Sequence, residues 1–238
     1  MKPRAGLLAG NLRLVIRDPI LVLAATIPLV LALLLRLAVP VAAELLRDRV
    51  DISPYLGLLL VLAAMMAPGM LGWLAGFLLL DERDEGVMQY VAVTPAGRPG
   101  FLAYRLAVPV AASFVLAFPV AAIAGISEVD YARLVPVAAI AALEAPLMAM
   151  YLAAFAGNKL EGLALAKAAG VFMLAPLAIV TESGWQYLAG VAPPFWPAKL
   201  FLLGDCSAVE YWLVAAGGLI VHGAYFMWLL SRVKARLD

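Results

Sequence analysis

Charged side chains are scarce in this sequence: they make up 14% of its 238 residues, whereas soluble globular domains average roughly 25%. Hydrophobic residues make up 66%, and the mean hydropathy is +1.00. A soluble chain of this length has no core large enough to bury so much apolar surface. The composition therefore excludes an ordinary soluble domain and indicates an integral membrane protein.

Cysteine and histidine are almost absent, which excludes several kinds of site. Cys206 is the only cysteine and His222 the only histidine, so we expect no intrachain disulfide, no cysteine-based metal site and no multi-histidine metal site. None of the lysines follows a glycine, as the lysine of a phosphate-binding loop does, and no Gly-x-Ser-x-Gly motif occurs. We therefore expect no catalytic site, metal or cofactor in this chain.

Long apolar runs dominate what is present. A helix needs about 20 apolar residues to cross a hydrocarbon core of roughly 30 Å. Six runs meet this length, and the predicted spans are Pro19–Val39, Pro54–Leu80, Phe101–Ala124, Tyr131–Phe155, Gly162–Val180 and Tyr211–Leu230. The sequence predicts an all-α integral membrane fold with six transmembrane helices, organised as one membrane domain over residues 1–238.

The placement of lysine and arginine predicts the orientation, because cytoplasmic loops are enriched in both. With the N-terminus in the cytoplasm, most of the 17 basic residues fall inside: Lys2, Arg4, Arg13, Arg17, Arg83, Arg98, Arg105, Lys159, Lys167, Arg232, Lys234 and Arg236. The outside set is smaller: Arg36, Arg47, Arg49, Arg133 and Lys199. Both termini are therefore predicted on the cytoplasmic side of the plasma membrane.

The segment Pro3–Asp18 is amphipathic and precedes the first span. On a helix, Arg13 and Arg17 fall opposite an apolar side made of Leu8, Leu12, Val15 and Ile16. We expect an interfacial helix that lies flat on the bilayer, with its basic groups toward anionic headgroups. Contact with a partner protein is the alternative role for this segment.

The loop Asp81–Leu106 between the second and third spans is rich in acidic residues at its start. A short helical turn follows, with apolar side chains at Val87, Met88, Tyr90 and Val91, and Thr94-Pro95 ends it. An apolar helix flanked by charge suits docking into a groove on another protein. The alternative is a solvated connector.

The segment Thr181–Glu210 before the last span combines aromatic residues with helix breakers. Trp185, Tyr187, Phe195 and Trp196 are of the type that anchors at the headgroup level, and Pro193, Pro194 and Pro197 interrupt any continuous helix. A loop resting on the membrane is one interpretation. A segment that re-enters the membrane is the other.

Small residues form two stripes at helical spacing. Gly72 and Gly76 make a GxxxG pair in the second span, and Gly162, Ala166 and Gly170 make a stripe in the fifth. Such faces let helix backbones approach closely in lipid. The fifth-span stripe fits either packing within the chain or contact with a second chain.

Two ionisable residues lie deep in predicted spans: Glu144 near the centre of the fourth and His222 near the centre of the sixth. A charged carboxylate there costs at least about 2.5 kcal/mol on insertion scales, so Glu144 needs a partner, a proton or a wet cavity. Both residues are candidates for a substrate path that favours cationic or amphipathic cargo. The alternative is a structural hydrogen bond to another helix, near the kink expected at Pro146.

The stretch DERDEGVMQYVAVTPAGRPGFLAYRL resembles the cytoplasmic loop of type-two ABC export permeases. In that family an acidic-Arg pattern, a glycine, a short helix and Thr-Pro lead into the third span. The Arg17-Asp18-Pro19 start, six spans and a long outer segment before the last span agree with it. DERDEG, VTP and the following YR resemble most closely the small permeases known as fluoroquinolone or multidrug exporters.

The resemblance implies a function and a set of partners. By position, Glu85–Val93 corresponds to the coupling helix that docks on the ATPase, which adds Glu85 to the four docking candidates above. ATP and Mg²⁺ would bind a separate ABC ATPase subunit, and the permease would pair with a second copy or a paralogue. The first and fifth spans form the dimer seam in that family, which assigns Gly162, Ala166 and Gly170 to it, and the segment before the last span re-enters the membrane near the extracellular exit.

The leading hypothesis is thus the transmembrane subunit of an ATP-driven exporter, with the lipid bilayer as its surroundings and no nucleic acid partner. A proton-coupled secondary transporter that uses Glu144 and His222 is the alternative. A membrane enzyme is a third and weaker hypothesis, because the sequence lacks the motifs it needs. Dependence on ATP separates the first two.

Overall fold

The computed structural model describes residues 19–93, 95, 97–204 and 206–237, and all of their regular elements are helical. These are α2 (Pro19–Leu46), η1 (Ser53–Tyr55), α3 (Leu56–Asp84), α4 (Val87–Ala92), α5 (Gly97–Ala124), α6 (Tyr131–Ala142), α7 (Glu144–Phe155), α8 (Lys159–Ala169), η2 (Gly170–Thr181), η3 (Gly184–Val191), α9 (Phe195–Leu202) and α10 (Ala208–Leu237). The predicted interfacial helix Pro3–Asp18 lies outside the described residues.

Six stretches of the described chain are long and apolar enough to cross a membrane, which confirms the predicted number of spans. They are Thr26–Leu46, Ser53–Asp84, Gly97–Ala124, Tyr131–Phe155, Lys159–Thr181 and Ala208–Arg236. The fourth consists of α6 and α7, and the fifth consists of α8 followed by the 3₁₀ helix η2. Several spans run past their apolar stretches, because a helix continues into polar sequence until a breaker or a cap ends it.

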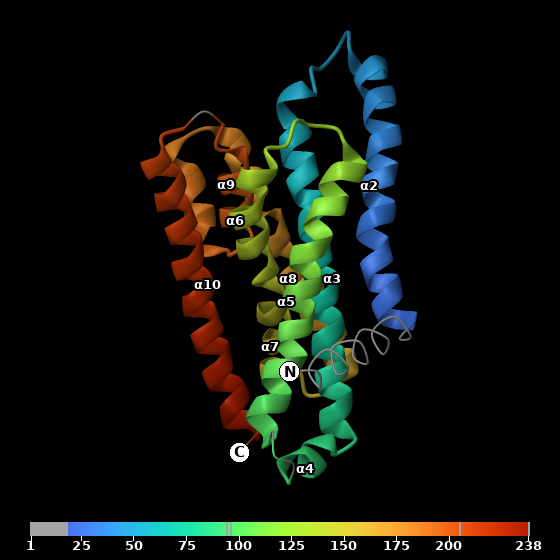
Figure 1. The fold of residues 1–238 in the computed structure, drawn as a ribbon, viewed down its shortest axis with the longest axis vertical. Helices are drawn as coiled ribbons and strands as arrows, with labels where there is room; N and C mark the ends of the chain where they lie inside the picture. The colour runs from blue at the N-terminus through green and yellow to red at the C-terminus, as the bar shows by residue number, and fades with distance from the viewer. Residues whose placement is uncertain (1–18, 94, 96, 205, 238) are drawn as a thin grey trace, which may run out of the picture.

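The spans form an elongated bundle (Figure 1). The short helix α4 and the C-terminal end of α10 lie at one end of it, and the turn between α2 and α3 lies at the other. Gly86 makes the turn from α3 into α4 with a left-handed φ of 73°, a conformation that glycine adopts without steric cost. The bundle thus has an α4 end and an opposite end.

The centre of the bundle is the contact between α3 and α7. In the apolar 18-residue part of each span, 78% of the residues are buried within the chain in the fourth span and 61% in the second, but only 11% in the first. A Cβ at Gly72 would lie 2.6 Å from the carbonyl oxygen of Ala145, and one at Gly76 would lie 2.9 Å from Leu152. The two backbones therefore meet at the glycine pair found in the sequence, as small residues allow in lipid.

The segment before the last span folds into η3 and α9, which pack beside η2, α6 and α10. Trp196 of α9 donates its indole N–H to the carbonyl of Gly190 at 2.8 Å. Its ring lies on Gly217 of α10, where a Cβ would come within 2.5 Å of it. This part of the chain is thus packed against the helices; its placement relative to a membrane stays a prediction.

The glycine contact between α3 and α7 yields a stability prediction. Gly72→Ala should lower the melting temperature of the purified protein in detergent, because overpacking a tight contact costs about 1–3 kcal/mol. Gly223→Ala is the matched control, since nothing lies within 4 Å of a Cβ built at that glycine of α10. There the same substitution should be neutral or stabilising, by up to about 1 kcal/mol. Equal melting temperatures for the two variants would contradict the packing described.

Candidate functional site

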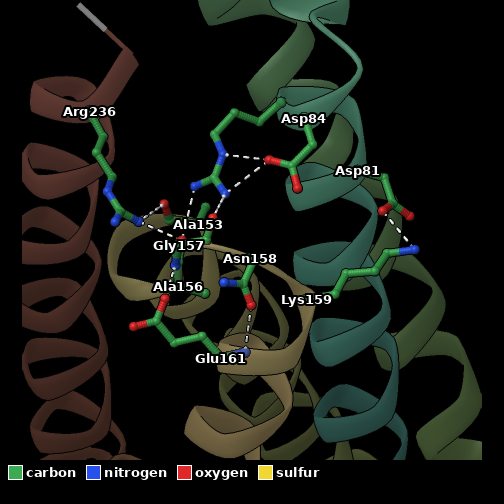
Figure 2. A network of polar contacts seen from close by, with 10 residues as sticks. Asp81, Asp84, Ala153, Ala156, Gly157, Asn158, Lys159, Glu161 and Arg236 are labelled. Atoms are coloured by element: carbon green, nitrogen blue, oxygen red, sulfur yellow. Dashed lines mark hydrogen bonds and ion pairs between the residues drawn. The ribbon is translucent and has the colours of Figure 1, made fainter.

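The acidic residues at the end of the second span form bonds between helices at the α4 end of the bundle. Asp81 forms an ion pair with Lys159 of α8 at 2.7 Å, and Glu82 pairs with Arg105 of α5. Directly after them in the sequence, Arg83 pairs with its neighbour Asp84 at 3.1 Å, within α3. The last turn of α3 is therefore joined by ion pairs to α5 and to α8. Figure 2 shows the pair to α8, between Asp81 and Lys159.

The same turn also holds the C-terminal end of α7. Arg83 donates to the carbonyls of Ala156 at 2.9 Å and Gly157 at 2.7 Å. From α10, Arg236 donates to the carbonyls of Ala153 at 3.3 Å and Ala156 at 2.7 Å. The last carbonyls of a helix lack intrahelical partners and carry partial negative charge. Two arginines from different helices supply the missing donors here.

The turn from α7 into α8 is fixed by its own side chains. Asn158 caps α8 by accepting from the backbone N–H of Glu161 at 2.9 Å, and Glu161 accepts in return from the N–H of Gly157. Figure 2 shows these residues beside Asp81, Asp84 and Arg236. We call the whole set the α4-end network: Asp81, Glu82, Arg83, Asp84, Arg105, Gly157, Asn158, Lys159, Glu161 and Arg236.

The predicted docking residues lie directly beside this network. The helix spans Val87–Ala92, slightly shorter than the predicted Glu85–Val93. Glu85 is exposed, Tyr90 is 75% exposed, and Val87 and Val91 are half-buried. The side chain of Met88 lies outside the described residues. An exposed aromatic ring on a short helix thus projects from the end of the bundle whose spans the network joins.

Glu144 and His222 form a second polar site, inside the bundle. Glu144 is fully buried and His222 is 1% exposed. Glu144 is the first residue of α7, at a break in the fourth span where Leu143 leaves the helix. The break has a local cause, because Pro146 lacks an N–H and its ring crowds the carbonyl four residues earlier. The helix is therefore interrupted near Pro146, and Glu144 lies at the interruption.

The hydrogen bonds of His222 show where its protons lie. Its Nδ1 is 2.7 Å from the carbonyl oxygen of Gly218, which can only accept, so Nδ1 carries a proton. Its Nε2 is 3.1 Å from Oε1 of Glu144. That second bond contains one proton, held either by the carboxyl or by the imidazole. The remaining carboxyl oxygen, Oε2, is buried without a hydrogen-bond partner.

Glu144 lines a cavity of about 250 Å³ between α7, α8, η2 and α10. Pro193 and Pro194, from the turn between η3 and α9, also line it. Four aromatic residues contribute to its walls, namely Tyr151, Phe172, Tyr225 and Trp228. The cavity is therefore largely apolar, with one buried carboxyl group.

Comparison with known proteins bears on both sites. The model of the family described as "Fluoroquinolones export permease protein Rv2686c-like" matches residues 11–230. The chain belongs to this permease family. It is 30% identical over 233 residues to the proteins named "Fluoroquinolones export permease protein MT2760" and "Fluoroquinolones export permease protein Rv2686c", from two strains of Mycobacterium tuberculosis. Each alignment covers 95% of this chain and 92% of the relative. No solved structure matches the permease.

The small-residue stripe of the permease makes contacts within the chain. A Cβ at Gly162 would lie 3.0 Å from Leu80 and 3.2 Å from Phe77 of α3. Ala166 packs on the same side, against the cluster that contains Leu80, whereas nothing lies within 4 Å of a Cβ at Gly170. For Gly162 and Ala166, these are the contacts expected if the stripe packs within the chain. The assignment of the stripe to a dimer seam stays a prediction.

Sequence reasoning identified both polar regions of the permease but not how their residues pair. It treated Glu144 and His222 as separate deep groups and did not join them. It also missed the bonds from Arg83 and Arg236 to the end of α7. Arginines at the ends of two spans are a weak sequence signal for such bonds, because their partners are backbone carbonyls that any sequence supplies.

The role of Arg236 can be tested by stability. Arg236→Gln should lower the melting temperature of the permease, since a hydrogen bond to a charged group contributes about 1.5–3 kcal/mol and this partly exposed site should give the lower value. Arg232→Gln is the matched control, because Arg232 is an exposed arginine one turn earlier on the same helix. If both variants melt at the wild-type temperature, Arg236 does not hold the end of α7 in solution.

Proposed function

We propose that this permease is the transmembrane subunit of an ATP-driven exporter that moves a drug-like or amphipathic substrate across the plasma membrane. The observation that carries the proposal is α4, a short helix with the exposed Tyr90, which projects beside the α4-end network. Membership of an export permease family supports the direction of transport. The names of the two relatives support a fluoroquinolone-like drug as the substrate class.

The network supports a path by which α4 transmits motion. A partner that grips Tyr90 and Glu85 moves the end of α3, to which α4 is joined through Gly86. That end is bonded to α5 through Glu82, to α8 through Asp81 and to α7 through Arg83. Displacement of α4 therefore acts on several spans together rather than on one. Apolar and aromatic residues on a short helix suit insertion into a groove of the partner.

The partner in this proposal is a separate ABC ATPase subunit, which binds ATP and Mg²⁺. The permease sequence has no phosphate-binding loop, so in this proposal another chain hydrolyses the ATP. The α4 end and both termini then face the cytoplasm, where the ATPase and its nucleotide are found.

A second copy of the permease, or a paralogue, completes the assembly that we propose. The first and fifth spans are the least buried within the chain, at 11% and 17%. Both expose large apolar side chains such as Leu37 and Val171, which face either lipid or another protein. These are the two spans that the family resemblance assigns to a dimer seam, with Gly170 of the proposed seam open to a partner.

Proton-coupled secondary transport is the second candidate function. The hydrogen bond between Glu144 and His222 favours it, because a buried carboxyl and imidazole that share one proton can exchange it with either side. In that mechanism the permease transports without any ATPase and responds to a proton gradient.

Energy coupling separates the two candidates. In proteoliposomes with a fluoroquinolone, the permease alone should hydrolyse no ATP and move no drug, and both activities should appear when its ATPase subunit is added. The readouts are phosphate release and drug accumulation, with and without a proton gradient. Drug movement driven by the gradient in the absence of an ATPase would overturn the proposal in favour of the proton-coupled mechanism.

The docking assignment has its own test at Tyr90. Tyr90→Asp should abolish ATPase binding and reduce transport by at least tenfold, because a charge in an apolar groove lacks a partner. Tyr131→Asp is the matched control, since Tyr131 is an exposed tyrosine that begins α6 at the opposite end. It should leave both properties unchanged. Co-purification of the ATPase and drug transport are measured, and normal values for Tyr90→Asp would place the docking surface elsewhere.

A further inference from the structure

The cavity beside Glu144 contains one buried polar atom whose bonding the chain does not complete. Oε1 of Glu144 is occupied by His222 at 3.1 Å. Oε2 is shielded from solvent and has no hydrogen-bond partner. Buried polar groups in proteins are nearly always hydrogen-bonded, so such an oxygen calls for an explanation. Glu144 is among the residues that line the cavity, and Oε2 is the carboxyl oxygen that no group of the described chain hydrogen-bonds.

The proton shared with His222 determines what Oε2 can do. If the imidazole holds the proton, Glu144 is a carboxylate and Oε2 is an acceptor. If the carboxyl holds it, the proton lies on Oε1 toward Nε2, and Oε2 is the carbonyl oxygen, which again only accepts. In both arrangements the cavity presents an acceptor. A bound molecule must therefore contribute an N–H or O–H donor at this point.

The walls of the cavity select for an aromatic molecule with positive charge. Tyr151, Phe172, Tyr225 and Trp228 come from three different elements, and aromatic faces attract cations and stack on other rings. An ammonium group adds charge to its hydrogen bond with the carboxyl, which strengthens that bond. An anion, by contrast, would meet an acceptor oxygen with no cationic side chain among the residues that line the cavity.

The cavity is also open on one side. Phe172 on η2 is 50% exposed and Trp228 on α10 is 45% exposed, so its mouth lies between these two elements. The closed side is formed by the buried residues Glu144, Leu147 and Leu229. Glu144 has no exposed surface at this closed side, so a molecule that enters past the two aromatic rings contacts its carboxyl group only when the lining side chains move apart.

We infer, building on the export function proposed above, that this cavity binds the substrate as an aromatic amine, with its ammonium group on Oε2 of Glu144 and its rings among the four aromatic side chains. His222 is a positioning residue in this arrangement. It holds Oε1 and so leaves Oε2 directed to the ligand.

Three probes with one ring system test the recognition: 1-naphthylmethylamine, 1-methylnaphthalene and 1-naphthoate. Binding is measured with tritiated 1-naphthylmethylamine on the purified permease in lipid nanodiscs, without ATPase or nucleotide, and the other two compounds are competitors. The amine should bind saturably. Methylnaphthalene and naphthoate should compete at least roughly tenfold more weakly than unlabelled amine, because each lacks the donor that a buried acceptor requires.

Three variants separate recognition from folding. Glu144→Leu should lose roughly ten- to a hundredfold in affinity for the amine. Glu144→Gln should retain more affinity than Glu144→Leu, since its amide can donate to Nε2 of His222 and still present an oxygen to the cavity. Ala169→Leu fills the cavity wall without touching the pair and should weaken binding of the amine and of methylnaphthalene together. Melting temperatures are measured in parallel.

Several outcomes would overturn the inference. They are equal affinity for the amine and methylnaphthalene, unchanged affinity in both Glu144→Leu and Ala169→Leu, or a cavity occupied by a co-purified lipid acyl chain that no probe displaces.

Because the assay contains no ATPase, its result is independent of the energy source. If transport is ATP-driven and Glu144→Leu and Ala169→Leu transport normally, the amine site is rejected and the exporter proposal stands. Amine binding with ATP-independent transport would reject the exporter proposal alone.

Discussion

The contact between α3 and α7 fixes the geometry of both polar sites. These two helices run side by side in the same direction, and their register is set where Gly72 meets Ala145 and Gly76 meets Leu152. A larger side chain at either glycine would push the backbones apart, since packed interiors have few voids. The same seam continues to the α4 end, where Arg83 bonds the carbonyls of Ala156 and Gly157. One line of contacts thus connects the buried carboxyl to the charged network.

This continuity gives the proposed docking helix a physical connection to Glu144. Glu144 begins α7, and Ala156 and Gly157 follow its last residue, so the helix is a rigid link of three turns between them. One residue, Leu143, separates α7 from α6. A pull on the last turn of α3 therefore acts on α7, and α7 carries Glu144. His222 adds α10, which also reaches the network through Arg236.

The spans and the short helix after the second one could be predicted from the sequence, because hydropathy and a glycine turn are local properties. The six spans appeared with end shifts of a few residues in most cases. The largest extensions are at α10, which spans Ala208–Leu237 where Tyr211–Leu230 was predicted, and at α2, which continues to Leu46. The helix α4 appeared between Gly86 and Val93, close to the predicted Glu85–Val93.

Pairings between spans could not be predicted in the same way. Glu144 and His222 are 78 residues apart in the chain, and their contact depends on the relative rotation of α7 and α10. Hydropathy gives the depth of a residue but not its direction around the helix axis. The ion pairs of the acidic residues could not be predicted for the same reason: Lys159 and Arg105 become neighbours of α3 only through helix packing. The sequence shows that these ionisable side chains need partners, but the packing of the helices decides which residues become the partners.

The distance of 78 residues between Glu144 and His222 also has a meaning in time. At a synthesis rate of about 5–20 residues per second, the ribosome completes His222 roughly 4–16 s after Glu144. During that interval the fourth span holds a carboxyl group without its imidazole partner. A single ionisable group of this kind is tolerated by the insertion machinery at a moderate cost. The last span therefore supplies the hydrogen-bond partner of Glu144 after the fourth span has been synthesised.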